Sequence, residues 1–335
     1  MGYVPKYTIT AHLLRLLESI ASMKTRIDLS TVSVAWAPPL AKEAFARTAH
    51  SSTAIEGNPL TLKEVQILAE GGDIPHAKPK HVKEVMNYLA ALKLVSQHKS
   101  KKTISTEDVL KIHTVIGKGV LDRDPLGAYR DYQVYVGTHI PPKAKDVERL
   151  MDELFEWLNG SGQALPAIFS SAILHYQFEY IHPFGDGNGR VGRTLALWEF
   201  FRKKFDTHHI FSVDEVFLEN RQRYYAALDN VRKENGDLTG WLEFSAEAVE
   251  LTLERVLLRI ETTRFSRKKE AVILSPKQEK LVNLLQNGPM GIREIQEQLE
   301  VTKAGAHFLL KPFVENGLIK RVGGHKTGKY TLSTE

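Results

Sequence analysis

The sequence of 335 residues contains no cysteine. This absence excludes disulfides, thiol nucleophiles and thiolate metal sites, and it favours a reducing compartment. No apolar run approaches the roughly 18 residues that a membrane span requires, and the first ten residues lack the apolar centre of a signal peptide. We therefore expect a cytoplasmic protein with no membrane partner.

The composition that remains is typical of an ordered globular protein, with 42% hydrophobic and 25% charged residues. At roughly 150 residues per domain, the length predicts about two domains. Residues 1–266 carry 33 basic and 33 acidic side chains, whereas residues 267–335 carry 12 basic and 7 acidic ones. The net charge of +5 therefore lies in the last fifth of the chain. This asymmetry predicts a separate basic module that contacts an anionic partner.

Hydrophobic spacing predicts a mainly α-helical protein. Leucine and isoleucine recur at helical spacing over residues 13–23, and an alanine-rich helix over about 40–57 ends at Gly57. Thr61 and Glu64 form a capping-box pattern that begins another helix. Further helices are expected at residues 81–96, 106–116, 147–158, 166–181, 188–201, 220–231 and 240–262.

One segment has a different period. Alternating apolar residues lead to Gly137-Thr138, a turn signal, and Pro141-Pro142 then ends the pattern. We therefore expect a short β-hairpin over residues 127–142.

The chain is expected to divide into four parts. An N-terminal helical region covers residues 1–100, and a central core covers residues 101–263. A run of basic residues predicts a solvated linker at 264–273, and a small domain follows at 274–335.

The densest cluster of polar and glycine residues is the segment 182–193, HPFGDGNGRVGR. Its glycines allow backbone N–H groups to approach a phosphate, the next helix presents its N-terminus, and arginine guanidinium groups match phosphate oxygens. Gly187, Gly189 and Gly192 also fit a dinucleotide fingerprint, with Asp214 downstream, but that motif follows a strand and residues 167–181 read as a helix. The segment therefore predicts an anion cradle with a base and a metal ligand beside it.

Every specified position of this segment matches HPFx[D/E]GNGRxxR, the signature that it resembles in the Fic (Fido) family. The resemblance implies a Fic-type helical core with a β-hairpin flap. It also implies a protein adenylyltransferase, which transfers AMP from ATP to a Ser, Thr or Tyr hydroxyl of a target protein or of the chain itself. The alternatives are removal of AMP, transfer of another phosphate-bearing group, and a DNA-binding regulator whose Fic core senses nucleotide.

The residue types in the segment suit this reaction. His182 can act as a general base near neutral pH, and Asp186 can hold Mg²⁺ between phosphates. Arg190 and the neighbouring backbone N–H groups can stabilise the departing pyrophosphate. By resemblance, Arg193 reaches the γ-phosphate and Phe184 anchors the loop. The residues expected to bind the nucleotide are Phe184, Gly187, Asn188, Gly189, Arg190, Val191, Gly192, Arg193, Asn220, Tyr224, Tyr225 and Asn235.

The expected hairpin resembles the family's flap, which holds a target segment by main-chain pairing. The flap residues expected to do so are Val134, Tyr135, Val136 and Ile140.

A second motif lies upstream. Glu56 falls in the last turn of its helix, where the helix dipole disfavours an anion, so it calls for a cation from elsewhere in the fold. Ser52, Glu56 and Gly57 match [S/T]xxxE[G/N], which resembles the Fic inhibitory pattern and implies that Glu56 binds Arg193 and blocks the γ-phosphate. The same glutamate can instead position a water that removes AMP, so the net direction stays open.

The C-terminal segment resembles a winged helix-turn-helix, with three expected helices followed by a glycine-tipped hairpin. Thr302, Lys303, His307 and Lys311 would face a DNA groove. Pro312 lies inside that helix, where it would kink or end it. DNA contact, protein docking and homodimerisation through residues 274–335 all stay open.

Overall fold

The computed structural model describes residues 2–30, 37–121, 125–137, 139–268, 276–286, 288–315, 318–323 and 328–333. The chain divides into two compact units, Met1–Ile260 and Glu261–Glu335. The mainly helical architecture that the sequence predicts is confirmed. Within the described ranges, no helix is both long enough and apolar enough to cross a membrane.

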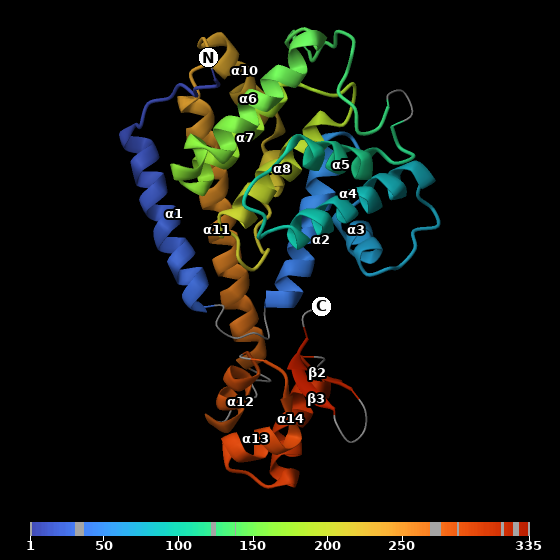
Figure 1. The fold of residues 1–335 in the computed structure, drawn as a ribbon, viewed down its shortest axis with the longest axis vertical. Helices are drawn as coiled ribbons and strands as arrows, with labels where there is room; N and C mark the ends of the chain where they lie inside the picture. The colour runs from blue at the N-terminus through green and yellow to red at the C-terminus, as the bar shows by residue number, and fades with distance from the viewer. Residues whose placement is uncertain are drawn as a thin grey trace. The chain divides into compact units, whose positions relative to one another are not determined.

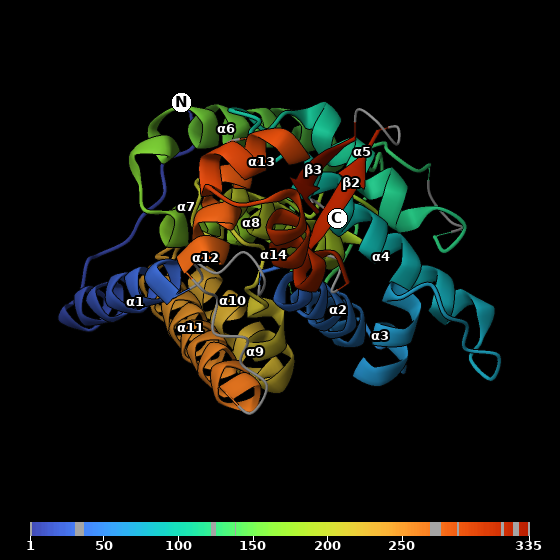
Figure 2. The same cartoon turned by 90° about the horizontal axis from the view of Figure 1, so that it is seen from below.

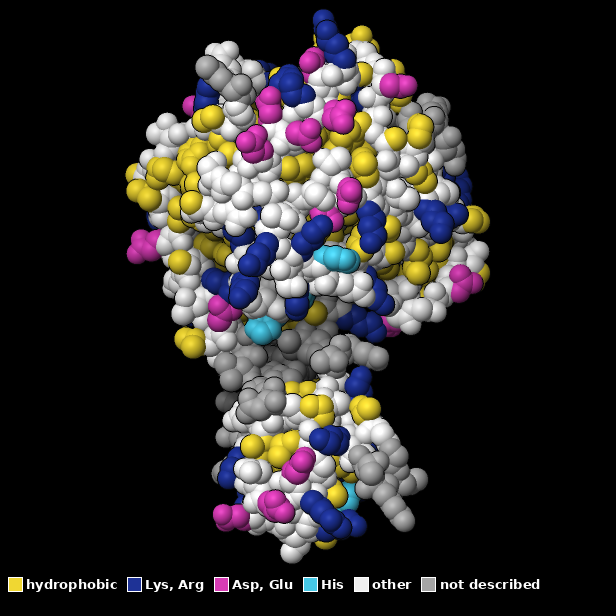
Figure 3. Space-filling model, in the orientation of Figure 1, with side chains coloured by type: hydrophobic (Ala, Val, Ile, Leu, Met, Phe, Trp, Pro, Cys, Tyr) yellow, Lys and Arg dark blue, Asp and Glu magenta, His cyan; other side chains and the backbone are white. Residues whose placement is uncertain are grey.

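The N-terminal unit is built from helices around one hydrophobic core (Figures 1 and 2). Side chains of both charge signs occupy the face shown in Figure 3. The elements in chain order are α1 (Ala11–Ser30), α2 (Ala37–Ile55), α3 (Leu62–Ala69), α4 (Pro79–Gln97), α5 (Thr106–Gly117), η1 (Ala144–Asp146), α6 (Val147–Asn159), η2 (Ser161–Ala164), α7 (Ala167–Ile181), α8 (Asn188–Arg202), α9 (Val213–Glu219), α10 (Arg221–Lys233) and α11 (Thr239–Lys268), whose residues after Ile260 belong to the second unit.

Helices α7 and α8 lie side by side in the middle of this unit (Figure 1). Nearly every residue of α7 is buried, and α8 buries most of its length as well. Helices that are buried on all sides belong to the core of a protein. The loop that joins them, residues 182–187, is therefore held at both ends by core helices.

The close approach of α7 and α8 depends on Gly192. A Cβ atom at this position would lie 2.5 Å from Glu179 Oε1 and 3.1 Å from Phe178 Cδ1. We expect Gly192→Ala to lower the free energy of unfolding by about 1–3 kcal/mol, measured by urea denaturation followed by tryptophan fluorescence.

Gly240→Ala is the matched control, because a Cβ at Gly240 meets no atom within 4 Å. The control should stay within about 0.5 kcal/mol of the unaltered chain. Equal stability of the two variants would contradict the packing role of Gly192.

The expected hairpin at 127–142 is reduced to one bridge, between Val136 and His139, which exchange hydrogen bonds of 3.0 and 2.9 Å. Pro141 and Pro142 have no N–H group, so the second strand cannot continue the ladder. The side chain of Gln133 donates to the Pro141 carbonyl oxygen instead, at 2.9 Å. Thr138, in the expected turn, lies outside the described residues.

Residues 264–268 of the linker expected at 264–273 are helical. Helix α11 continues to Lys268, because no glycine or proline interrupts residues 241–268 and arginine and lysine are good helix formers. Residues 269–273 lie outside the described part of the chain.

The C-terminal unit contains α12 (Pro276–Gln286), β1 (Met290–Gly291), α13 (Ile292–Leu299), α14 (Lys303–Glu315), β2 (Ile319–Val322) and β3 (Lys329–Leu332). The strands form an antiparallel sheet in the order β1-β3-β2, with Met290 opposite Tyr330 and Ile319 opposite Leu332. The sequence did not predict β1, because two residues show no alternation. Helix α14 runs past Pro312, which lies in its last turn.

Candidate active site

His182 begins the loop between α7 and α8 in a left-handed backbone conformation, with φ 50° and ψ 62°. A residue with a side chain rarely adopts this conformation without support. Arg130 supplies that support, because its Nε donates to the His182 carbonyl oxygen at 2.8 Å. The same guanidinium donates to Pro142 O at 2.6 Å, and the Arg130 backbone N–H donates to Pro183 O at 2.9 Å. Arg130 therefore ties the loop to the 127–142 segment, a role that the sequence did not reveal.

Phe184 anchors the loop in the core, as the family resemblance implies. Its ring is fully buried and stacks on His113, with ring centroids 3.8 Å apart. Asn188 closes the loop, because its Oδ1 accepts from Phe184 N at 2.9 Å and its Nδ2 donates to Phe184 O at 2.8 Å. Gly187 takes φ 83° just before α8, where a residue with a Cβ would be strained. The loop therefore has one well-defined shape.

The His182 imidazole is neutral over the physiological pH range. Burial lowers the pKa of His182 to about 4, and the neighbouring His139 and Arg130 act in the same direction. A neutral imidazole can accept a proton, which is what a general base must do.

Asp186 offers an accessible carboxylate. Its side chain is 64% exposed, and Oδ1 lies 3.3 Å from Arg190 Nη2 and accepts from Gly187 N at 2.5 Å. Within the described ranges, no group of three or more His, Asp or Glu side chains could hold a metal ion. Mg²⁺ usually takes only one or two protein carboxylates together with phosphate oxygens and water. A lone exposed carboxylate at the start of α8 therefore fits Mg²⁺ that arrives with a nucleotide.

The buried Arg190 pairs with a carboxylate that the sequence did not point to. Its Nη1 contacts Oε1 of Glu84, from α4, and Glu84 Oε2 accepts from Asn58 Nδ2 at 2.8 Å. Asn58 Nδ2 also donates to His81 O at 3.0 Å. The guanidinium that should meet phosphate is thus already neutralised from two sides, by Glu84 and by Asp186.

Arg193 meets the motif found upstream in the sequence. Its Nη2 lies 2.7 Å from Glu56 Oε1, its Nε donates to Ser52 Oγ at 2.7 Å, and its side chain is 1% exposed. Burial opposes ionisation of Glu56, but Arg193, Arg190 and Arg221 together hold its pKa below the usual range. Both partners are therefore charged, and the predicted contact between Glu56 and Arg193 is present.

Two glycines make room for this ion pair. Gly57 has φ 95° and ends the turn that carries Glu56. A Cβ at Gly189 would collide with Glu56 Oε1 and would lie 3.1 Å from Arg193 Nη1. The first turn of α8 therefore admits the carboxylate because residue 189 has no side chain.

The four residues expected around the adenine and ribose differ in their exposure to solvent. Tyr224 is 1% exposed and its hydroxyl pairs with His175 Nε2 at 2.8 Å. Asn220 Nδ2 donates to Val216 O at 3.1 Å, and Asn220, Tyr225 and Asn235 are all exposed. Two adjacent tyrosines on a helix point in different directions, and the sequence cannot tell which of them faces the core.

The flap residues, in contrast, are open to a partner. Tyr135 is 71% exposed and Ile140 is 66% exposed, Val136 is also exposed, and Val134 is half-buried. Arg130 connects this segment directly to the His182 carbonyl. The flap therefore presents apolar side chains beside the loop.

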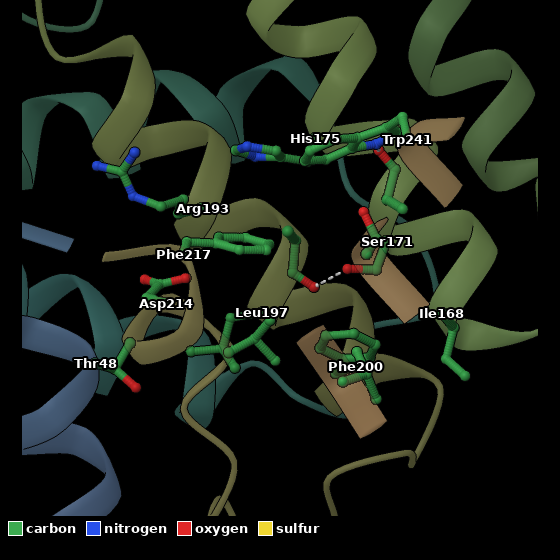
Figure 4. A pocket seen from close by; sticks show the side chains of 15 residues that line it. Thr48, Ile168, Ser171, His175, Arg193, Leu197, Phe200, Asp214, Phe217 and Trp241 are labelled. Carbon is green, nitrogen blue, oxygen red and sulfur yellow. Dashed lines mark hydrogen bonds between the residues drawn. The ribbon is translucent and has the colours of Figure 1, made fainter. Parts of the chain in front are cut away.

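A small cavity lies in the core behind the loop (Figure 4). Phe217, Trp241 and Leu197 line it together with Arg193 and Asp214, and the guanidinium of Arg193 points away from the aromatic rings. Its volume is about 30 Å³, which is room for about two water molecules. It is too small and too apolar to hold a nucleotide.

In the C-terminal unit, α14 buries Ala306, Leu310 and Phe313 and presents the opposite face to solvent. His307 and Phe308 are exposed there, Phe308 to 75%, and Lys303 is exposed at the start of the helix. The charge of Lys303 suits contact with a phosphate backbone, and the exposed ring of Phe308 suits contact with a protein surface.

Comparison with known proteins agrees with the geometry. Residues 103–199 match the model of the Fic/DOC family. Residues 103–199 therefore form a domain of the Fic/DOC family. The chain is 33% identical over 223 residues to protein adenylyltransferase Fic of Nematostella vectensis, covering 64% of this chain and 49% of that one. It is 30% identical over 249 residues to the protein of the same name from Drosophila melanogaster, covering 72% and 48%. The chain thus spans about half the length of these curated relatives.

Solved structures show the same Fic fold. A Fic family protein from Desulfovibrio desulfuricans is 25% identical, with a TM-score of 0.66 over 99% of both chains. Residues 134–508 of Fic-1 from Caenorhabditis elegans are 27% identical, with a TM-score of 0.63 over 75% of this chain and 73% of that one.

Proposed function

We propose that this Fic protein is an adenylyltransferase that transfers AMP from ATP to a hydroxyl side chain of a target protein, and that Glu56 restrains it. The observation that carries the proposal is the placement of a neutral His182 on a rigid loop that leads directly into α8. On that helix Arg190 reaches Asp186 in the loop, and Arg193 lies about one turn further along, where it binds Glu56. Distant relatives named protein adenylyltransferase Fic add support.

The reaction needs a base, an anion cradle and a leaving-group site. The target hydroxyl oxygen attacks the α-phosphorus, its proton moves to His182, and the bond from the α-phosphorus to the pyrophosphate oxygen breaks. The first N–H groups of α8 and the guanidinium of Arg190 stabilise the charge that gathers on pyrophosphate. Asp186 would hold Mg²⁺, which supplies positive charge to the phosphate oxygens.

The restraint follows from the occupancy of Arg193. A guanidinium that is already bonded to Glu56 and Ser52 has few donors left for a γ-phosphate. We propose α2 as the inhibitory helix on this ground, because Glu56 directly follows its last residue, Ile55. Displacement of Glu56 would open the site to ATP in the productive orientation.

The test uses the Glu56→Gly chain incubated with Mg²⁺ and either α-labelled or γ-labelled ATP. Label in protein from the α-position alone is the expected result, because AMP retains only that phosphorus. Label from the γ-position would overturn the assignment in favour of phosphate transfer. Loss of AMP from an already modified chain, without its addition, would instead indicate the reverse activity.

The pH dependence of the transfer should reflect the base. Because burial lowers the pKa of His182 to about 4, the imidazole is neutral above that pH and protonated below it. The initial rate of AMP incorporation should therefore fall as the pH drops through about 4. A fall centred near 6.5, the ordinary histidine value, would contradict this prediction.

A further inference from the structure

Glu179 is a carboxylate in the core of the site that the proposed reaction does not use. It lies on the last turn of α7, three residues before His182, and its Oε2 is 3.7 Å from His182 Nδ1. The two side chains are only 13% and 15% exposed. The carboxylate therefore faces the side of the imidazole opposite to Nε2.

Both side chains have unused hydrogen-bonding capacity. Glu179 Oε1, which faces Gly192, and His182 Nδ1 are buried and have no hydrogen-bond partner of good geometry within the part of the chain that the structure describes. A buried polar atom without a partner costs free energy, so its retention calls for an explanation. A small rotation of either side chain would bring the two groups into hydrogen-bond distance.

We propose that Glu179 is a positioning residue for His182, whose ionised carboxylate accepts a hydrogen bond from Nδ1–H and so leaves the lone pair on Nε2. The inference rests on the proposed function, in which Nε2 takes the proton of the target hydroxyl. A neutral imidazole carries one N–H, so fixing that hydrogen on Nδ1 decides which nitrogen is the base. The carboxylate also stabilises the imidazolium that forms.

The charge on Glu179 depends on its surroundings. Burial raises the pKa of Glu179 to about 8, with Arg193 and Arg232 opposing this rise and Glu56 adding to it. The carboxyl is therefore protonated below about pH 8 and ionised above it. The other titratable or charged groups that face the pair are His139 and Arg130 in the 127–142 segment and Tyr224 on α10.

The backbone carbonyl of Glu179 also lies near the ring, outside good hydrogen-bond geometry, and acts to raise the pKa of His182. This carbonyl is unchanged by substitution of the side chain. Glu179→Gln therefore distinguishes the effect of the side-chain carboxylate from the effect of the backbone carbonyl. Glutamine has nearly the shape of the protonated carboxyl but cannot ionise.

The first measurement needs no catalysis. In the nucleotide-free chain with ¹³C,¹⁵N-labelled histidine, the His182 resonances are assigned by their loss in His182→Ala. Titration from pH 6 to 9.5 should move them with a midpoint near 8, toward the Nδ1–H tautomer, and Glu179→Gln should abolish that step. If the His182 resonances of Glu179→Gln also shift with a midpoint near pH 8, the proposal is wrong.

Two further variants guard against misleading results. Asp206→Asn removes another buried acid with a raised pKa, whose oxygens accept from the backbone N–H groups of Ile210 and Phe211, and it should leave the His182 step in place. Glu179→Asp withdraws the carboxylate by one methylene and should reduce the size of the step. Loss of the step in Asp206→Asn would overturn the assignment to Glu179.

The second measurement is the rate of AMP incorporation against pH in the Glu56→Gly background. Loss of the Glu56 charge lowers the pKa of Glu179. The rate should therefore rise severalfold with increasing pH, and the midpoint of this rise should lie at a lower pH than the midpoint of the NMR titration. Glu179→Gln should flatten this rise. A rise that persists in Glu179→Gln would refute the positioning role, whereas absence of transfer at every pH would refute the proposed function and leave the NMR result to decide the role of Glu179.

Discussion

Glu56→Gly should raise the rate of AMP incorporation from ATP by roughly 5- to 150-fold. This range corresponds to the typical coupling free energy between two sites in a protein. The substitution removes the carboxylate that lies 2.7 Å from Arg193 Nη2 and leaves Arg193 available to the γ-phosphate. Glycine also has no side chain that could occupy the space beside Gly189. The measurement is the initial rate at which label from α-labelled ATP enters the chain itself and the proteins of a lysate, at fixed concentrations of ATP and Mg²⁺.

Glu70→Gly is the control for loss of a glutamate. Glu70 is a cap residue at the end of α3 and forms an exposed ion pair with Lys42 at 3.1 Å. Its substitution should leave the rate of transfer unchanged. A Glu56→Gly chain as slow as this control would show that Glu56 does not restrain the reaction.

In the released Glu56→Gly background, His182→Ala should lower the rate of transfer by about 10²- to 10⁴-fold, the usual contribution of a general base. The loop shape should survive, because Arg130 binds the backbone of residue 182 and Phe184 anchors the loop. ATP binding, measured by calorimetry, should therefore stay within a few-fold of the parent.

The matched histidine control is His76→Ala. His76 is largely exposed and pairs with Glu64 in α3, so its loss should not change the rate. Retention of full activity by His182→Ala would exclude His182 as the base. Equal loss of activity and ATP binding would instead indicate a structural role.

Much of the site was predictable because its chemistry is contiguous in the chain. Residues 182–193 form one loop and one helix start, so their spacing alone brings together the proposed base, the proposed metal ligand and the two arginines. The Glu56–Arg193 contact joins residues 137 positions apart, and only the resemblance of the upstream pattern pointed to it. The mainly helical Fic fold follows from hydrophobic periodicity together with that same resemblance.

The missing parts depend on tertiary packing. Arg130 reaches the loop and Glu84 reaches Arg190, both from distant segments, and nothing in their local sequence distinguishes them from solvated charges. Glu179 sits next to the motif, yet its burial becomes visible only when α8 packs against α7. The alternation of apolar residues predicts a longer hairpin than the structure has. Pro141 and Pro142 lack the N–H groups that a second strand needs, and apolar alternation does not reflect this.

The side chain of Arg193, only 1% exposed, has a consequence for how this protein would bind nucleotide. A buried guanidinium needs an anionic partner at all times, so in the absence of nucleotide Glu56 occupies the position beside Arg193. ATP must then exchange one counter-ion for another, against a carboxylate present at the high effective concentration of a tethered group. The measured dissociation constant would be the intrinsic value divided by the fraction of molecules in which Glu56 has left.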